Sequence, residues 1–230
     1  MVDQVLAERL DWQGQGTALL TAAVSRLDDA ELAEPSRLPG WSRAHVIGHL
    51  SRNADALRNL LTWARTGVET PMYPNTAARD ADIESTAALP PAALRADLIA
   101  TVTALEADVA EMTDDAWAGP VRTRQGRAIT GAEVPWMRCR EVWVHAVDLD
   151  AGIEFTDFPS AIGVAMLTDA CAFAANNPAT PGVRIRAIDA DFELTLGDGA
   201  TEVARPLAEL LGWVLGREDR PDLPALPAWL

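Results

Sequence analysis

Lysine is absent from this sequence of 230 residues, so all 19 basic residues are arginine. Without a lysine amine, a Schiff-base mechanism is excluded. Cysteine is scarce as well, because Cys139 and Cys171 are too few and too far apart for a disulfide framework. Neither belongs to a Cys-x-x-Cys pair, and we expect both to be small buried residues.

Long apolar stretches are also missing. No uninterrupted run approaches the length of a membrane span, and the first residues carry charges where a signal peptide would be apolar. We therefore expect a soluble, cytoplasmic protein. Positive charge is in deficit, with a formal net charge of −15. Such a chain repels nucleic acid and anionic membranes, so neither is an expected partner, and an anionic substrate would need a local cation.

Helical periodicity dominates the first two thirds of the chain. The pattern predicts helices over about residues 3–33, 43–66, 91–112 and 131–150. Ser42 is the expected N-cap of the second helix, and Thr130 with Glu133 matches a capping box at the start of the fourth. The arginine-rich segment 117–129 is expected to be a loop. Four such helices with modest connections predict an antiparallel bundle.

The pattern changes after Gly152. The elements expected there are a helix over residues 160–176, half-buried strands at 183–187 and 192–196, a short strand near Val203, and a helix from Pro206 to Gly216. We therefore predict an α+β protein with two domains. Residues 1–153 would form the four-helix bundle, and residues 154–230 a small α/β domain.

The three histidines belong to two pairs of metal-capable residues with a spacing of four, His45 with His49 and Glu141 with His145. Residues four apart share one face of a helix, so two adjacent helices could aim His49, Glu141 and His145 at one point. Two imidazoles and one carboxylate are a ligand set that catalytic zinc favours, with a fourth position left open. His45 is either a further ligand or a residue that packs or forms hydrogen bonds.

A Glu–His pair at this spacing is most often a solvated surface pair. Here the apolar residues around Glu141 and His145 indicate that much of the helix is buried, and buried charge needs a partner such as a metal. Polar residues continue both faces, with Arg138 and Asp148 on one helix and Asn53 on the other. We predict that these three orient the ligands or bind a cofactor.

These residues lie in stretches that resemble the mycothiol-dependent maleylpyruvate isomerases, a branch of the DinB-like metal-binding four-helix bundles. The similar stretches are Gly40–His49, Thr66–Tyr73, Trp136–Arg138 and Arg140–Leu149. The resemblance extends over the whole chain and is dense in the second and fourth predicted helices. It implies that His49, Glu141 and His145 hold a catalytic zinc and that Arg217 is a catalytic arginine.

The resemblance further implies a zinc- and mycothiol-dependent cis–trans isomerase. Such an enzyme converts maleylpyruvate to fumarylpyruvate by reversible thiolate addition, a step of gentisate-type degradation of aromatic compounds. The chain itself offers no convincing nucleophile, and a cofactor thiol fills that gap. The implied substrate is a small dicarboxylate, whose carboxylate Arg217 could hold with two parallel hydrogen bonds. The expected assembly is a monomer or a weak homodimer.

Three alternatives remain open at this point. A metal-dependent mycothiol S-transferase would consume mycothiol, whereas an isomerase would regenerate it. A non-catalytic module would bind a metal or a small molecule. In a third case the histidines and the glutamate only form buried hydrogen bonds, which a metal analysis of the purified protein would reveal.

Overall fold

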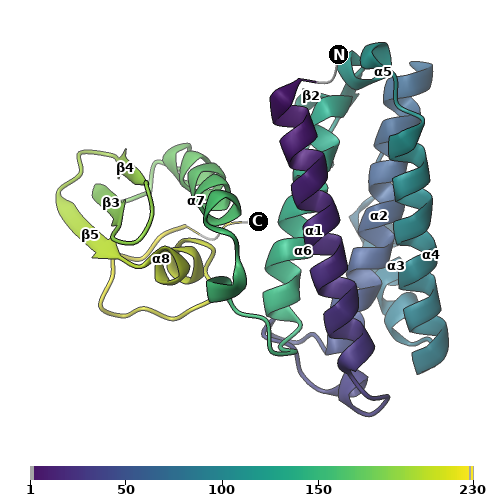
Figure 1. Cartoon of the computed structure of the whole chain (residues 1–230), viewed down its shortest axis with the longest axis horizontal. Coiled ribbons are helices and arrows are strands. Elements are labelled where there is room, and N and C mark those ends of the chain that lie inside the picture. Colours follow the sequence, from purple (N-terminus) through teal and green to yellow (C-terminus); the bar gives the residue numbers. More distant parts are fainter. Residues whose placement is uncertain (1–2, 228, 230) are drawn as a thin grey trace. The chain divides into compact units, whose positions relative to one another are not determined.

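The computed structural model describes residues 3–227 and 229, and the chain divides into two compact units, Met1–Gly152 and Ile153–Leu230. Figure 1 shows long helices in the first unit and a smaller set of helices and strands in the second. Within the described residues, no helix has both the length and the apolar character needed to cross a membrane.

Four long helices form the bundle of the first unit. They are α1 (Gln4–Arg26), α2 (Arg43–Thr66), α4 (Pro91–Ala110) and α6 (Val134–Asp148). Helix α1 packs on α6 and α4, and α2 packs on the same two helices. Their facing sides bury aliphatic side chains, among them Leu6, Leu57, Leu60, Leu105 and Val134. Burial of this apolar surface is the main force that holds the bundle together.

Helix α2 begins and ends where the sequence predicts. The Ser42 side chain accepts the backbone N–H of His45, and the His45 side chain accepts the backbone N–H of Ser42. Gly67 ends the helix with a left-handed φ of 72°, which glycine adopts without steric cost. These two caps fix the start and the end of the helix that carries His49.

The long helices do not alternate strictly in direction. An additional helix between α2 and α4, which the sequence pattern did not predict, brings the chain back to the end of the bundle at which α2 begins. This helix, α3 (Thr76–Ala87), packs on α2. Helices α2 and α4 therefore run parallel, and ion pairs from Arg52 to Asp97 and from Arg58 to Asp108 join them in register. Helices α2 and α6 are antiparallel, as the contacts of His49 with Glu141 and of Asn53 with Arg138 show, whereas strict alternation would have made these two helices parallel.

The first helix is shorter than predicted. It ends at Arg26, and Glu31–Ala33 form a separate 3-10 turn, η1. The cause is Asp28, whose Oδ1 accepts the backbone N–H groups of Ala30 and Glu31 at 2.8 and 2.9 Å. A side chain that satisfies backbone donors in this way starts a new turn.

The predicted capping box at Thr130 and Glu133 is wrong. The Thr130 side chain makes no capping bond, and Gly131–Glu133 form a 3-10 turn, η2, before α6 begins at Val134. The Glu133 carboxylate accepts a hydrogen bond from Arg9 of α1 at 2.9 Å, so it is engaged between helices.

The segment expected to be a loop also contains regular structure. Helix α5 (Asp114–Ala118) precedes an antiparallel hairpin of β1 (Pro120–Arg122) and β2 (Ala128–Thr130). Only the central residue of each strand is buried, Val121 in β1 and Ile129 in β2. One buried residue in a short arginine-rich strand leaves too weak a pattern to detect.

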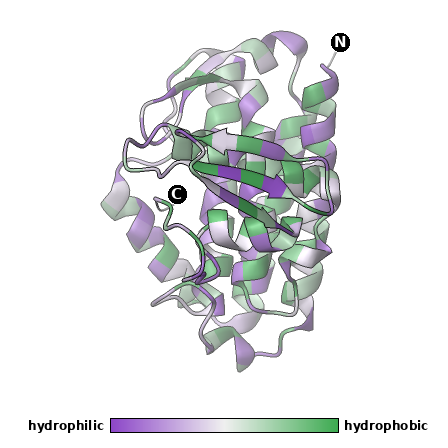
Figure 2. Cartoon of the chain, turned by 90° about the vertical axis from the view of Figure 1, so that its left-hand side faces the viewer, coloured by the Kyte–Doolittle hydropathy of each residue, from purple (hydrophilic) through white to green (hydrophobic). Residues whose placement is uncertain are grey.

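The second unit is a small sheet with two helices. Its elements are η3 (Phe155–Asp157), α7 (Ser160–Ala175), β3 (Val183–Ala187), β4 (Glu193–Leu196), β5 (Thr201–Arg205) and α8 (Leu207–Val214). Strand β3 lies between β4, with which it is antiparallel, and β5, with which it is parallel. Figure 2 shows hydrophobic and hydrophilic residues alternating along these strands, as expected for a sheet with one covered face. The predicted fold class, a helical bundle with a small α/β part, is confirmed.

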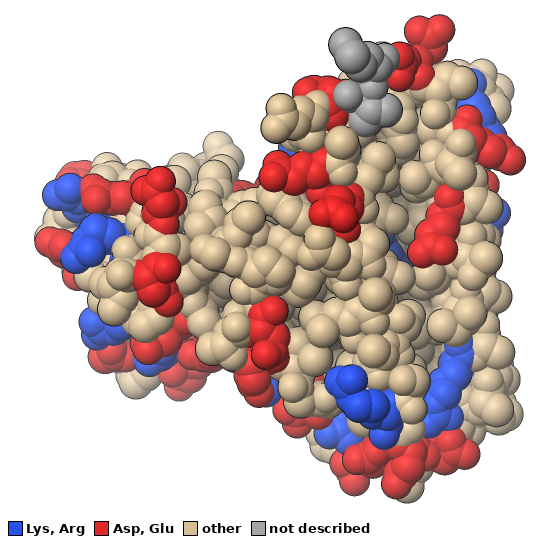
Figure 3. Space-filling view, viewed as in Figure 1, with Lys and Arg blue, Asp and Glu red and all other residues tan. Residues whose placement is uncertain are grey.

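Acidic side chains (red) outnumber arginines (blue) on the face of the molecule shown in Figure 3. The surface field is therefore negative overall, and any cation that attracts an anion has to act locally.

Candidate metal centre

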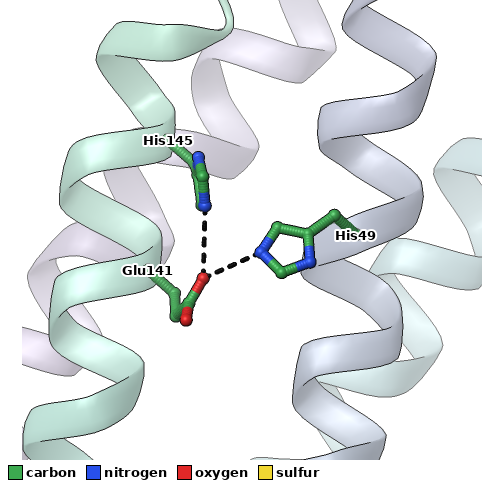
Figure 4. A group of neighbouring side chains, drawn as sticks. All are labelled: His49, Glu141 and His145. Atoms are coloured by element: carbon green, nitrogen blue, oxygen red, sulfur yellow. Dashed lines mark hydrogen bonds and ion pairs between the residues drawn. The ribbon is translucent and has the colours of Figure 1, made fainter. Parts of the chain in front are cut away.

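Three side chains converge between α2 and α6 in the first unit (Figure 4). His49 Nε2 lies 2.9 Å from Glu141 Oε2, and His145 Nε2 lies 3.2 Å from the same oxygen. The two imidazole rings are nearly perpendicular, with centroids 4.8 Å apart. The antiparallel packing of α2 on α6 brings together residues that are far apart in the sequence.

The centre is largely closed to solvent. The side chains of His49 and His145 are 7% and 12% exposed, and that of Glu141 is 29% exposed. A ligand would therefore reach the centre on the side of the glutamate. Trp41 packs against the His49 ring with centroids 5.6 Å apart, which limits access from the start of α2.

Asp148 holds His145 from behind. Its Oδ2 lies 2.8 Å from His145 Nδ1, and its side chain is fully buried. This bond fixes the orientation of the ring and leaves Nε2 directed at the centre, as a partner of a metal-binding histidine does. Asp148 therefore contacts a proposed ligand and is buried away from solvent.

The charges of the cluster favour a cation. Burial opposes an imidazolium at His145, but hydrogen bonds to Asp148 and Glu141 outweigh it and raise the pKa to about 9. Burial would likewise raise the pKa of Glu141, yet hydrogen bonds from His145 and His49 hold it well below its ordinary value. Burial lowers the pKa of His49, and its bond to Glu141 opposes this shift. The carboxylates thus stabilise a positive charge at this point.

His45 lies outside the cluster. Its Nδ1 is 2.7 Å from Ser42 Oγ, and its Nε2 is 3.3 Å from Glu84 of α3. The residue thus caps α2 and contacts α3, which is a structural role.

Asn53 and Arg138 bind each other beside the centre. Arg138 Nη1 donates to Asn53 Oδ1 and to the backbone oxygen of Leu50, both at 2.8 Å. Arg138 is fully buried, and burial lowers its pKa to about 10, partly offset by Glu141. Its Nη2 finds no hydrogen-bond partner among the described residues. The pair therefore joins α2 to α6 beside the centre.

Two residues that the sequence analysis did not select also adjoin the centre. Arg79 Nη2 of α3 lies 3.4 Å from His49 Nδ1, and Arg79 Cζ lies 6.0 Å from the ring centroid of Tyr73. Burial, with a smaller contribution from Glu141, raises the pKa of Tyr73 to about 12, so the phenol remains neutral and can donate a hydrogen bond. Tyr73 also lines a cavity of about 280 Å³ with Trp63 and Arg124.

Arg217 lies in the second unit, just after α8. Its backbone N–H donates to the oxygen of Gly212 at 2.8 Å, and its Nη1 donates to the oxygen of Leu215 at 3.0 Å. Gly216, with a φ of 68°, makes the turn that separates it from the helix.

Neither cysteine resembles a nucleophile. Cys139 and Cys171 are free and buried, and burial raises the pKa of each thiol to about 12. Both would remain protonated at neutral pH, which makes them poor nucleophiles.

The donor set fits a divalent metal. Tetrahedral zinc with ligands at ~2.0–2.2 Å places its ligand atoms ~3.3–3.6 Å apart. The three donor atoms here lie within 4.8 Å of one another, and the two contacts to Glu141 are only slightly shorter than those values. Small rotations of the side chains would open the cluster to a metal. The fold and the centre together define a helical bundle with a candidate metal site that has two histidines and one glutamate.

Comparison with known proteins places this bundle in a family. Residues 14–150 match the family model described as the mycothiol maleylpyruvate isomerase N-terminal domain. A crystal structure of the mycothiol-dependent maleylpyruvate isomerase is similar with a TM-score of 0.91 and 36% identity, covering 97% of both chains. The structure of a histidine-to-alanine mutant of that enzyme gives a TM-score of 0.90 and 35% identity over the same share. A comparison with curated proteins gave no match.

The chain therefore belongs to the mycothiol-dependent maleylpyruvate isomerase family, a family of isomerases. The resemblance inferred from the sequence is confirmed, including its extent over the chain.

Proposed function

We propose that this protein is a zinc- and mycothiol-dependent cis–trans isomerase that converts maleylpyruvate to fumarylpyruvate. The observation that carries the proposal is the convergence of His49, Glu141 and His145 inside a fold that matches such an isomerase at 36% identity. The same proposal includes a role in gentisate-type degradation of aromatic compounds and a cytoplasmic location.

His49, Glu141 and His145 are the proposed metal ligands. Two imidazoles and one carboxylate form a set that catalytic zinc prefers, and they leave a fourth position for a ligand. Asp148 keeps the His145 ring in place through its bond to Nδ1, so that Nε2 can bind the metal. The negative charges of Glu141 and Asp148 would balance the charge of the metal.

The thiol has to come from the cofactor, because the protein thiols are buried and protonated. When bound, zinc and mycothiol would together supply a thiolate near neutral pH, which would be able to add reversibly to the cis double bond of the substrate and so allow rotation about it.

The residues of the protein would hold the substrate during this step. Arg217 is proposed to hold a carboxylate with two parallel hydrogen bonds. Arg138 and Asn53 are proposed to contact the cofactor or position the groups around Glu141, because Nη2 of Arg138 is buried and has no hydrogen-bond partner among the described residues. A guanidinium near the substrate would also stabilise the negative charge that would develop on the substrate, as an enolate, when a thiolate adds to its double bond.

The test is a turnover assay on maleylpyruvate with the zinc content measured on the same sample. We expect about one zinc per chain, fumarylpyruvate as the product, no turnover without mycothiol, and no net loss of mycothiol. Cys139→Ser and Cys171→Ser should retain most of the activity. Turnover in a thiol-free buffer would contradict the proposal, and stoichiometric consumption of mycothiol would identify an S-transferase instead.

A further inference from the structure

Arg79 contacts the candidate metal centre from a helix that carries none of the proposed ligands. It lies in the first turn of α3, and only 19% of its side chain is exposed. Its Nη2 is 3.4 Å from His49 Nδ1, its Nη1 is 2.8 Å from Asp80, and its guanidinium faces the ring of Tyr73. The guanidinium therefore lies behind the one proposed ligand that α2 provides.

A hydrogen bond from Arg79 to His49, whose Nη2 and Nδ1 are 3.4 Å apart, would fix which ring nitrogen of His49 carries the proton. A guanidinium can only donate, so His49 Nδ1 has to accept with its lone pair. The proton of the neutral ring then lies on Nε2, which donates it to Glu141 at 2.9 Å. This arrangement is consistent, but it places the proton on the nitrogen that faces the centre.

A metal on His49 Nε2 would reverse this arrangement. The nitrogen that binds a metal must offer its lone pair, so the proton of the neutral imidazole moves to Nδ1. Nδ1 can then no longer accept a hydrogen bond from Arg79. The bond from Arg79 to His49 and a metal on His49 therefore exclude each other.

We infer that Arg79 is an anion-binding residue of the metal centre, which metal binding releases from His49 so that it can hold a carboxylate of the substrate. This inference rests on the proposed function, because it assigns a specificity role for the same dicarboxylate. It is separate from Arg217, which belongs to the second unit.

The surroundings of Arg79 suit an anion. Its remaining ion-pair partner, Asp80, has a side chain that is 57% exposed and thus well solvated. Tyr73 offers a neutral hydroxyl, which forms a hydrogen bond with Arg79 and also lies in the electrostatic field of Arg79 and Arg124. Arg138 adds a buried donor near Glu141. These cations would offset the repulsion that a dianion meets from a protein with a net charge of −15.

The experiment measures binding of maleate, a cis dicarboxylate, to zinc-loaded and zinc-free protein by calorimetry without mycothiol. Zinc affinity is measured in parallel by competition with a chelator. We expect wild-type protein to bind maleate more tightly when zinc is present. Arg79→Leu, which removes every donor, should weaken maleate binding to the zinc-loaded protein by about tenfold or more. Its zinc affinity should be equal or higher, because the competing bond to His49 is lost.

Arg79→Lys and Arg95→Leu complete the set. Arg79→Lys keeps the charge without the planar fork and should lose an intermediate amount of maleate affinity, and it remains informative if Arg79→Leu does not fold. Arg95 is the matched control, because its partly buried guanidinium pairs with Asp29 and Leu27 away from the cluster. Arg95→Leu should bind maleate within about twofold of wild type.

Three results would overturn the inference. The first is unchanged maleate affinity in both Arg79 variants. The second is a parallel loss of zinc affinity, which would mean that Arg79 only positions His49. The third is wild-type protein whose maleate binding is absent or insensitive to zinc. None of these affinity measurements involves turnover. A failure of the proposed isomerisation would therefore be detected separately, as wild-type protein without activity on maleylpyruvate.

Discussion

Glu141 is the residue on which the cluster depends, because one carboxylate oxygen accepts from both imidazoles. Its Oε2 lies 2.9 Å from His49 Nε2 and 3.2 Å from His145 Nε2. Removing the carboxylate leaves two buried rings without their shared acceptor and removes the negative charge that favours a cation between them. The glutamate is therefore expected to matter for metal affinity as much as either histidine.

The first residue-scale prediction concerns zinc content. His49→Ala, Glu141→Ala and His145→Ala should each lose most of the zinc, because each leaves only two of the three proposed ligands. His45→Ala is the control and should keep it, because His45 bonds to Ser42 and approaches Glu84 instead. Metal analysis of the purified variants gives the answer. Full zinc retention in Glu141→Ala would show that the ligand set is wrong.

The second residue-scale prediction concerns the pH dependence of stability in the zinc-free protein. The folded-state pKa of His145 is raised from 6.5 to about 9, so its contribution is complete below pH 6.5 and disappears as the pH rises through 9. Between these values the free energy of unfolding should fall by roughly 1–3 kcal/mol. Urea unfolding at a series of pH values measures this change.

Two controls isolate the contribution of His145. Zinc-free His145→Gln should show a much smaller fall over the same range, because glutamine does not titrate. The fall should also be suppressed in zinc-loaded wild type, where Nε2 would bind the metal and carry no proton. A fall of equal size in His145→Gln would assign the effect to other groups.

At the scale of the elements, close approach of α1 to α6 sets the frame that positions α6. A Cβ added at Gly16 of α1 would lie 2.5 Å from Nε1 of Trp143 and 2.6 Å from Val142, closer than real contacts allow. Trp143 Nε1 in turn donates to the backbone oxygen of Trp12 at 2.9 Å. A side chain at position 16 would have to displace this tryptophan, which lies two residues from Glu141.

We predict opposite effects for two alanine substitutions in α1. Gly16→Ala should destabilise the protein by about 1–3 kcal/mol, because overpacking outweighs the gain in helix propensity. Gly14→Ala should stabilise it by about 0.5–1 kcal/mol, because a Cβ at exposed Gly14 meets nothing within 4 Å. Urea unfolding of both variants tests the pair. Equal changes in stability at the two positions would mean that the close contact between α1 and α6 does not determine the effect of the substitution at Gly16.

The elements that the sequence predicted are those with strong local signals. Helix α2 has a serine cap and a terminal glycine, and β3 alternates between buried Val183 and Ile185 and exposed arginines. Helix α3 lacked such a signal because it is rich in small and acidic residues and buries only Ile83 and Thr86. The capping box failed because Glu133 bonds to Arg9, a contact between helices that no local pattern reveals.

The residues of the candidate site likewise differ in how far local signals in the sequence could predict them. The spacing of four between Glu141 and His145 indicated their shared face, and the packing of α2 on α6 brought His49 to them. Arg79 could not be found in this way, because it lies on α3, which had not been predicted, and its contact with His49 spans 30 positions of the sequence. Residues that reach a site from an unpredicted element therefore need the structure.

At the scale of the whole molecule, the chain separates the proposed metal ligands from the proposed substrate arginine. All three ligands lie within Met1–Gly152, and Arg217 lies within Ile153–Leu230. The first unit alone is therefore expected to bind zinc, while isomerisation should need the full chain. This division of roles is the reason to test Arg217 by a substitution that leaves the metal centre intact.

The prediction for the whole molecule is that Arg217→Ala keeps the zinc and the fold but loses activity. The expected loss of transition-state stabilisation is ~2–5 kcal/mol, as for truncation of one partner of a buried charge pair, and appears as a fall in kcat/KM. Arg217→Lys should restore little, because an ammonium lacks the planar two-point grip. Arg184→Ala is the matched control in the same unit, since Arg184 is exposed and pairs with Glu193, and it should keep kcat/KM near that of wild type. Near wild-type kcat/KM in Arg217→Ala would remove this residue from the proposed site and leave Arg138, whose buried Nη2 has no hydrogen-bond partner among the described residues, as the next arginine to substitute.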